Sequence, residues 1–122
     1  MSSLQEAALI AVRDCMGAKP GESLLVIVDE GTRAVGEALF DAGRSLGLES
    51  MIVEMLPRTR NGEEPPKAIA EIMKHVDILM APTSKSLSHT VAREEACRQG
   101  VRCATLPGIT EECMARCLAA DY

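Results

Sequence analysis

Residues Ser23–Val28 read SLLVIV, so one polar residue is followed by five aliphatic ones. A strand that is apolar on both faces fits inside a parallel sheet, because helices then cover the sheet on both sides. Turn-forming residues flank the run, with Pro20-Gly21 before it and Asp29-Glu30-Gly31 after it. The segment therefore predicts a buried central strand in an α/β fold.

Helical and strand patterns alternate along the rest of the chain. Apolar residues at helical spacing predict helices over residues 4–16, 33–46, 67–74, 88–99 and 110–120. Short apolar runs predict further strands over residues 49–56, 78–81 and 101–106. This alternation is typical of βαβ units with right-handed crossovers. The predicted fold class is a three-layer αβα, flavodoxin- or Rossmann-like domain built on a four-stranded parallel sheet.

The expected strand order is 2-1-3-4, which places the strand that ends near Glu54 at an edge. This residue interrupts one face of the second strand, and an edge strand tolerates such an interruption better than a central one. The topological switch point, where the strand order reverses, then falls between the first and third strands, and ligands bind there in sheets of this kind. Residues 29–32 and 83–89 are therefore expected to face one another across a crevice.

Chain length and composition limit the class of protein. A chain of 122 residues is expected to form a single domain, residues 1–122. The net charge of −5, the absence of a basic cluster and the scarcity of aromatic residues argue against nucleic acid as a partner. No segment has the length of a membrane span, and the N-terminus lacks the basic region of a signal peptide. A cytoplasmic location is expected.

The cysteines agree with that location. They are odd in number, irregularly spaced and without a C-x-x-C pair, which favours reduced thiols: Cys15, Cys97, Cys103, Cys113 and Cys117. Cys113 and Cys117 are four residues apart and would share a helix face. They could begin a metal site, but small buried side chains are the preferred interpretation.

Three serines alternate along the polar loop after the third predicted strand: Ser84, Ser86 and Ser88. With Lys85 and the free N–H groups of the next helix, they could hold a carboxylate or phosphate group. Alternatively, they cap that helix and satisfy hydrogen bonds of the turn. The sequence leaves both interpretations open.

Four further residues complete the set of candidate ligand-binding residues: Asp29, Thr32, His89 and Arg93. Asp29 could meet a cation or be an exposed turn residue, and Thr32 is expected to cap the next helix. His89 could act as a base or an anion contact, or lie on the surface without a role. Nucleotide-binding glycine motifs, a glycine-flanked serine and zinc-ligand spacing are absent from the sequence. No catalytic residue and no metal ligand is predicted.

The segment of residues 57–66 is the most polar and turn-rich part of the chain. It is expected to be exposed and mobile, near the same edge of the sheet. Glu63 and Glu64 are interpreted as solvated loop charges.

Four short motifs resemble the aminopeptidase T-like leucyl metallo-aminopeptidases, of the thermophilic type. They lie at Gly21-Glu22, Gly62–Pro66, Thr83–Arg93 and Pro107–Glu111, and the resemblance spans nearly the whole chain. Members of that family are longer, and Glu, His and Asp residues of their C-terminal half hold the metal ions. The resemblance thus implies an N-terminal domain, with no metal ligand or catalytic base carried over.

The resemblance also implies partners and cofactors. A divalent metal such as zinc or cobalt is expected in the full-length family, with no cofactor in this chain. Peptide substrate is expected to bind only when a C-terminal catalytic domain is present. In the full-length family, the N-terminal domain helps to form the substrate cavity and the dimer. The alternatives are a stand-alone module that binds small anions and a dimerisation module, both without catalysis.

Overall fold

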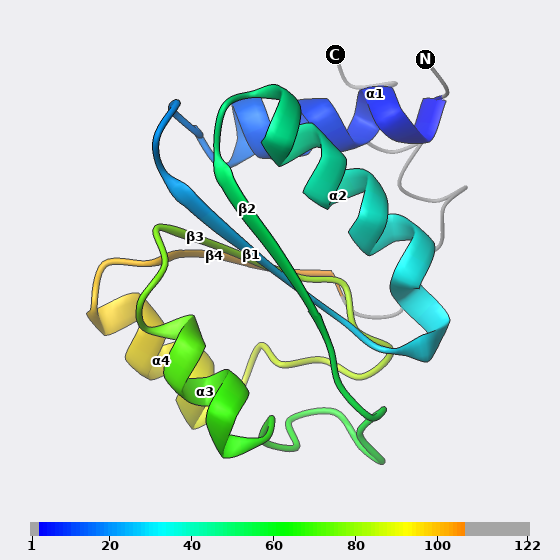
Figure 1. Ribbon diagram of the computed structural model, residues 1–122. Helices are drawn as coiled ribbons and strands as arrows, with labels where there is room; N and C mark the ends of the chain where they lie inside the picture. The colour runs from blue at the N-terminus through cyan, green and yellow to red at the C-terminus, as the bar shows by residue number, and fades with distance from the viewer. Residues whose placement is uncertain (1–2, 107–122) are drawn as a thin grey trace.

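A four-stranded parallel sheet forms the centre of the molecule (Figure 1). The computed structural model describes residues 3–106. Its strands are β1 (Ser23–Val28), β2 (Glu49–Glu54), β3 (Ile78–Ala81) and β4 (Arg102–Thr105). They lie in the order β2-β1-β3-β4, and every neighbouring pair is parallel. The predicted fold class and strand order are confirmed.

Helices cover both faces of the sheet. They are α1 (Ser3–Ile10), its π-helical continuation η1 (Ala11–Cys15), the short 3-10 turn η2 (Glu30–Thr32), α2 (Arg33–Ser45), α3 (Lys67–Met73) and α4 (Val91–Arg98). Figure 1 shows α1 and α2 on one side of the sheet and α3 and α4 on the other. The helix predicted over residues 110–120 and the turn before it lie outside the described residues.

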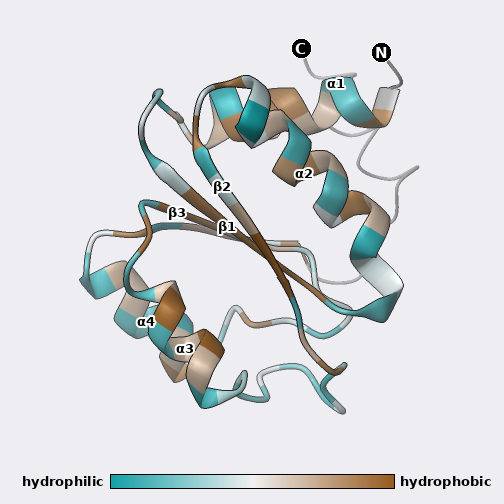
Figure 2. Cartoon of the chain, in the orientation of Figure 1, coloured by the Kyte–Doolittle hydropathy of each residue, from teal (hydrophilic) through white to brown (hydrophobic). Residues whose placement is uncertain are grey.

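Successive residues of β1 point to opposite layers, as the period of a strand requires. Leu24, Val26 and Val28 belong to the apolar cluster under α1 and α2, whereas Leu25 and Ile27 belong to the cluster under α3 and α4. All five side chains are at most 2% exposed. In Figure 2 the central strands are largely brown while the surrounding loops are largely teal. The prediction of a central strand buried on both faces is confirmed.

Two glycines bring α2 close to the sheet. A Cβ atom on Gly36 would lie 2.1 Å from Cγ1 of Val28, and one on Gly43 would lie 2.4 Å from Oγ of Ser50. Neither position has room for a methyl group, so the helix backbone rests directly on β1 and β2.

Strand β2 lies at the edge of the sheet, as predicted from the position of Glu54. The guanidinium of Arg33 donates to the carboxylate of Glu54 at 2.7 and 2.8 Å, so the interrupting charge is paired at the surface. Met51 and Ile52 are each 37% exposed. An edge strand has only one neighbouring strand, which leaves part of its side chains uncovered.

Element boundaries differ from the sequence-based ones in two informative places. The predicted helix over residues 4–16 changes to π-helical geometry after Ile10. The helix predicted from residue 88 begins at Val91, because Thr90 has an extended backbone and its hydroxyl accepts the N–H of Arg93 at 3.1 Å. A threonine in that role marks the start of a helix.

An ion pair ties the start of β4 to the N-terminal segment. Arg102 binds the carboxylate of Glu22, and its Nη1 donates to the carbonyls of Met16 and Gly17 at 2.9 Å each. The hydrogen bond from Arg102, with one from the N–H of Lys19, holds the pKa of Glu22 below its usual value of 4.5. The side chain of Glu22 is 27% exposed, so solvent screens part of the interaction.

The Glu22 ion pair is expected to make stability depend on acid pH. Since the pKa of Glu22 is lower in the folded than in the unfolded chain, the stabilisation is complete above pH 4.5 and is lost as the pH falls through the folded pKa. Melting temperatures of Glu22→Gln should therefore fall below those of the parent at neutral pH and converge with them under acid. Glu37→Gln, on the exposed side of α2, is the matched control. A constant difference between parent and Glu22→Gln from pH 7 to pH 3 would contradict this.

Within residues 3–106, no helix is both long and apolar enough to cross a membrane.

Candidate functional site

The segments that follow β1 and β3 meet at the carboxyl edge of the sheet, as predicted. Asp29 is completely buried, and its carboxylate accepts the N–H of Ser84 at 2.7 Å and the hydroxyl of Ser84 at 2.8 Å. A Cβ on Gly31 would lie 3.2 Å from the same hydroxyl, so the two segments touch. Asp29 thus uses both carboxylate oxygens to join the loop after β3 to the end of β1.

The prediction that Thr32 caps α2 is wrong. Thr32 precedes the helix, but its side chain makes no capping hydrogen bond to it. The hydroxyl instead turns back to Asp29, accepting its backbone N–H at 3.2 Å and lying 3.3 Å from its Oδ1. A neighbouring buried carboxylate is a stronger partner for a hydroxyl than an amide of the helix.

The loop of residues 84–88, here called the serine loop, is hydrogen-bonded to the loop between β2 and α3 and to the end of β4. The N–H of Ser86 donates to Asn61 at 2.8 Å, and the carbonyl of Ser86 accepts the N–H of Gly62 at 2.9 Å. The hydroxyl of Ser86 accepts the N–H of Ser88 at 3.0 Å, and the hydroxyl of Ser88 is hydrogen-bonded to that of Thr105 at the end of β4. In the structure, these side chains satisfy the hydrogen bonds of the turn, and their binding of a ligand stays a prediction.

The interpretation of Glu63 and Glu64 as solvated charges is incomplete, because Glu64 is exposed but both carboxylates also accept hydrogen bonds from the chain. Glu64 accepts the N–H groups of Val91 and Ala92 at 2.8 and 3.2 Å, although 27 residues separate it from the first of them. Glu63 accepts the N–H and hydroxyl of Thr59 at 2.8 Å, and these bonds lower the pKa of Glu63. The expected free N–H groups of α4 are therefore occupied, because a carboxylate of the chain itself fills the place of an anion.

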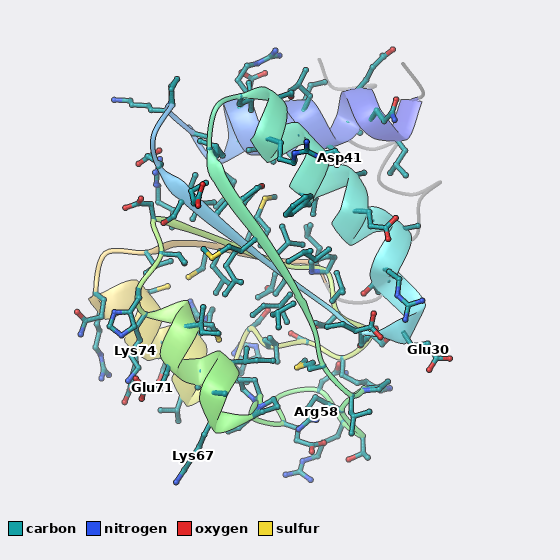
Figure 3. The ribbon with its side chains drawn as sticks, viewed as in Figure 1. Glu30, Asp41, Arg58, Lys67, Glu71 and Lys74 are labelled. Carbon is teal, nitrogen blue, oxygen red and sulfur yellow. The ribbon has the colours of Figure 1, made fainter. Side chains whose placement is uncertain are left out.

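Arg58 orders the loop between β2 and α3 (Figure 3). Its Nε and Nη2 donate to the carbonyl of Leu56 at 3.2 and 3.1 Å, and its Nη1 donates to the carbonyl of Glu64 at 3.4 Å. These bonds join both ends of the segment that carries the Glu64 cap. The mobility expected for residues 57–66 stays a prediction.

Removal of the Glu64 carboxylate is expected to weaken the start of α4. Glu64→Gln loses the charge that faces the helix dipole and one of two well-placed acceptors, which costs about 1 kcal/mol of unfolding free energy. Urea denaturation measures the loss. Glu94→Gln is the control, because Glu94 is an exposed acid in the first turn of the same helix. Equal losses in the two variants would show that general charge, and not the cap, is responsible.

The candidate residues form two groups in space. Asp29, Thr32 and Ser84 are bonded together, and Ser86 and Ser88 follow along the loop. Arg93 joins the second group, because its Nε donates to the carbonyl of Ser88 at 2.6 Å. His89 is exposed and forms no hydrogen bond with these residues in the described part of the chain.

Two important residues escaped the sequence analysis, for different reasons. Thr90 had a local signal, because a threonine directly before an apolar helix start is a typical cap. Glu64 had none, since its partners are brought to it only by the packing of α4 beside the preceding loop. Among residues 3–106, no group of three or more His, Cys, Asp or Glu side chains is arranged to hold a metal ion.

Comparison with known proteins shows the fold. No protein-family description and no curated protein sequence matches the chain. The structure is similar to 2,5-dihydroxypyridine dioxygenase from Pseudomonas putida KT2440, with a TM-score of 0.75 and 16% identity over 97% of this chain and 38% of that one. It is also similar to AmpT from Thermus thermophilus, with a TM-score of 0.59 and 14% identity over 95% of this chain and 41% of that one. The chain thus spans about two fifths of either protein.

Proposed function

We propose that this chain is the N-terminal domain of a metal-dependent aminopeptidase and lacks the metal ligands itself. The observation that carries the proposal is the motif resemblance to this family, and the structural likeness to AmpT over 95% of the chain agrees with it. The motifs at Gly62–Pro66 and Thr83–Arg93 support it, because they resemble the same family. In this proposal the domain releases no amino acid alone. A C-terminal catalytic domain holds a divalent metal such as zinc or cobalt and binds the peptide in the cytoplasm.

The geometry at the carboxyl edge supports a positioning role for this domain. The carboxylates of Asp29 and Glu64 and the hydroxyl of Ser88 are all bonded within the chain. Such groups fix the shape of a loop, and that shape can form one wall of a substrate cavity whose chemistry is supplied elsewhere. The exposed His89 and the partly exposed Lys85 are the side chains of this rim that are best placed to meet a second domain.

The likeness to the dioxygenase makes a second assignment testable. Two proteins with different activities share this fold, and a fold by itself does not determine an activity. The TM-score is higher for the dioxygenase, 0.75 against 0.59 for AmpT, so shape alone favours a domain of an oxygenase. The motif resemblance is what favours the aminopeptidase.

The test compares the 122-residue chain with the product of the complete reading frame that contains it. The short chain should release no leucine from leucine p-nitroanilide with added zinc or cobalt, and the complete product should do so. Metal-dependent release by the short chain would overturn the assignment of catalysis to another domain. Oxygen consumption by the complete product with 2,5-dihydroxypyridine, without peptide cleavage, would overturn the aminopeptidase in favour of the oxygenase.

The remaining alternatives make separate predictions. An anion-binding module should be stabilised by phosphate or a carboxylate in a thermal-shift assay, and Ser86→Ala with His89→Ala should abolish the shift. The capping of α4 by Glu64 counts against this module, because it removes two of the donors that such a site needs. A dimerisation module should have twice the chain mass in light scattering, and a monomeric mass would exclude it.

A further inference from the structure

Two cysteines lie in contact between α4 and β4. Sγ of Cys97, in the last turn of α4, is 3.4 Å from Sγ of Cys103 in the middle of β4. Nη1 of Arg93 donates to Cys97 at 3.5 Å, and the thiol of Cys103 donates to the carbonyl of Val101 at 3.6 Å. A cation, two sulfurs and a backbone acceptor thus form one continuous chain of hydrogen bonds.

The two thiols have different surroundings. Cys97 is exposed, and the guanidinium of Arg93 stabilises negative charge on its sulfur. Cys103 is half-buried, and burial, followed by the hydrogen bond and charge of Cys97, raises its pKa to about 12. Cys97 is therefore the accessible sulfur, with a guanidinium at hydrogen-bond distance, while Cys103 stays protonated beside it.

We propose that Cys97 and Cys103 are an oxidation site that reacts with hydroperoxides to form a reversible disulfide between α4 and β4. The Cys97 thiolate attacks the terminal oxygen of the hydroperoxide, the O–O bond breaks, and Cys97 becomes a sulfenic acid. The alkoxide that leaves takes up the proton that Cys97 had released, which gives an alcohol.

The second step uses the neighbouring thiol. The sulfur of Cys103 attacks the sulfenic sulfur, the S–S bond forms and the S–O bond breaks. The hydroxide that leaves combines with the proton of the Cys103 thiol as water. The two thiols together lose two electrons, and the hydroperoxide gains these two electrons. A disulfide requires the sulfurs to approach from 3.4 Å to about 2.05 Å.

Oxidation at this site also reaches the candidate functional loop. Arg93 contacts Cys97 through Nη1 and the carbonyl of Ser88 through Nε at 2.6 Å. Disulfide formation displaces the sulfur to which Nη1 of Arg93 donates, so it changes one of the two contacts of this side chain and leaves the one with Ser88. Arg93 thus contacts both the thiol pair and the loop that carries Ser88.

The test uses the full chain with the other three cysteines replaced by serine: Cys15, Cys113 and Cys117. Treatment with hydrogen peroxide should give an intact protein that has lost two hydrogen atoms, with a bond between Cys97 and Cys103 in peptide mapping, and dithiothreitol should reverse it. In a further Cys103→Ser variant, dimedone should trap a sulfenic acid at Cys97. Oxidation of both sulfurs to separate acids without a disulfide would overturn the proposal, as would a disulfide only between different molecules.

The role of Arg93 has its own readout. Arg93→Gln should slow the reaction with peroxide by about threefold or more, because it removes the cationic donor 3.5 Å from the reacting sulfur, which stabilises the negative charge of the transition state. Arg93→Lys should restore most of the rate by restoring the charge. Arg98→Gln is the matched control, since Arg98 is an exposed cation on the same helix. Equal rates for Arg93→Gln and Arg98→Gln would refute activation by Arg93.

Discussion

Replacement of Asp29 with alanine is expected to lower the free energy of unfolding by about 2–4 kcal/mol. The carboxylate is completely buried and binds Ser84 at 2.7 and 2.8 Å and the hydroxyl of Thr32 at 3.3 Å. Without it, the N–H and hydroxyl of Ser84 lose their partner, and the hydroxyl of Thr32 keeps only the backbone of residue 29. Urea denaturation measures the change.

Two further variants separate the contacts of Asp29 from its charge. Glu30→Ala removes the neighbouring acid, which is exposed, and should change stability very little. Asp29→Asn keeps the shape but replaces one acceptor with a donor, so its loss should fall between those of the other two. A similar small loss in Asp29→Ala and Glu30→Ala would show that the junction between the ends of β1 and β3 is dispensable.

Replacement of Gly36 with alanine is expected to lower the free energy of unfolding by about 3 kcal/mol, although alanine in place of glycine usually stabilises a helix. The new methyl group would lie 2.1 Å from Cγ1 of Val28, and 3.3 Å from Cδ1 of Ile52. Val28 is held in the central strand and is 1% exposed, so it has little freedom to withdraw. Thermal and urea unfolding both report the loss.

A double-substitution cycle tests the origin of that cost. Val28→Ala removes the carbon that collides with the new methyl group, so Gly36→Ala should cost much less in that background. Glu37→Ala is the control for helix propensity, because Glu37 is exposed on the same helix. Additive losses for Gly36→Ala and Val28→Ala would mean that the close approach of α2 to β1 does not cause the destabilisation.

The sequence predicted the arrangement of elements better than the contacts at their ends. One polar and five aliphatic residues sufficed to identify β1 as central, and Glu54 sufficed to place β2 at the edge. Both signals are local, because burial on one or both faces is written in consecutive residues. The meeting of Asp29 with the serine loop followed from the strand order by geometry.

The errors concern polar side chains with more than one available partner. Thr32 had a helix end on one side and a buried carboxylate on the other, and only the folded structure shows which one it binds. Glu64 caps a helix that is distant in sequence. Hydrogen-bond partners that come together through tertiary packing leave no periodic pattern in a sequence, so such residues are found only from coordinates.

The sheet separates two apolar clusters, and of the strands within residues 3–106 only β1 and β3 contribute fully buried residues to both. Energetic coupling between substitutions requires shared neighbours. Truncations such as Leu39→Ala on α2 and Met73→Ala on α3 should therefore have additive effects on stability, whereas either should be non-additive with changes in the strands that it touches. Side chains in one cluster can therefore be exchanged without regard to the other cluster. The exceptions are residues of β1 and β3, where a change in the backbone alters the packing on both faces of the sheet.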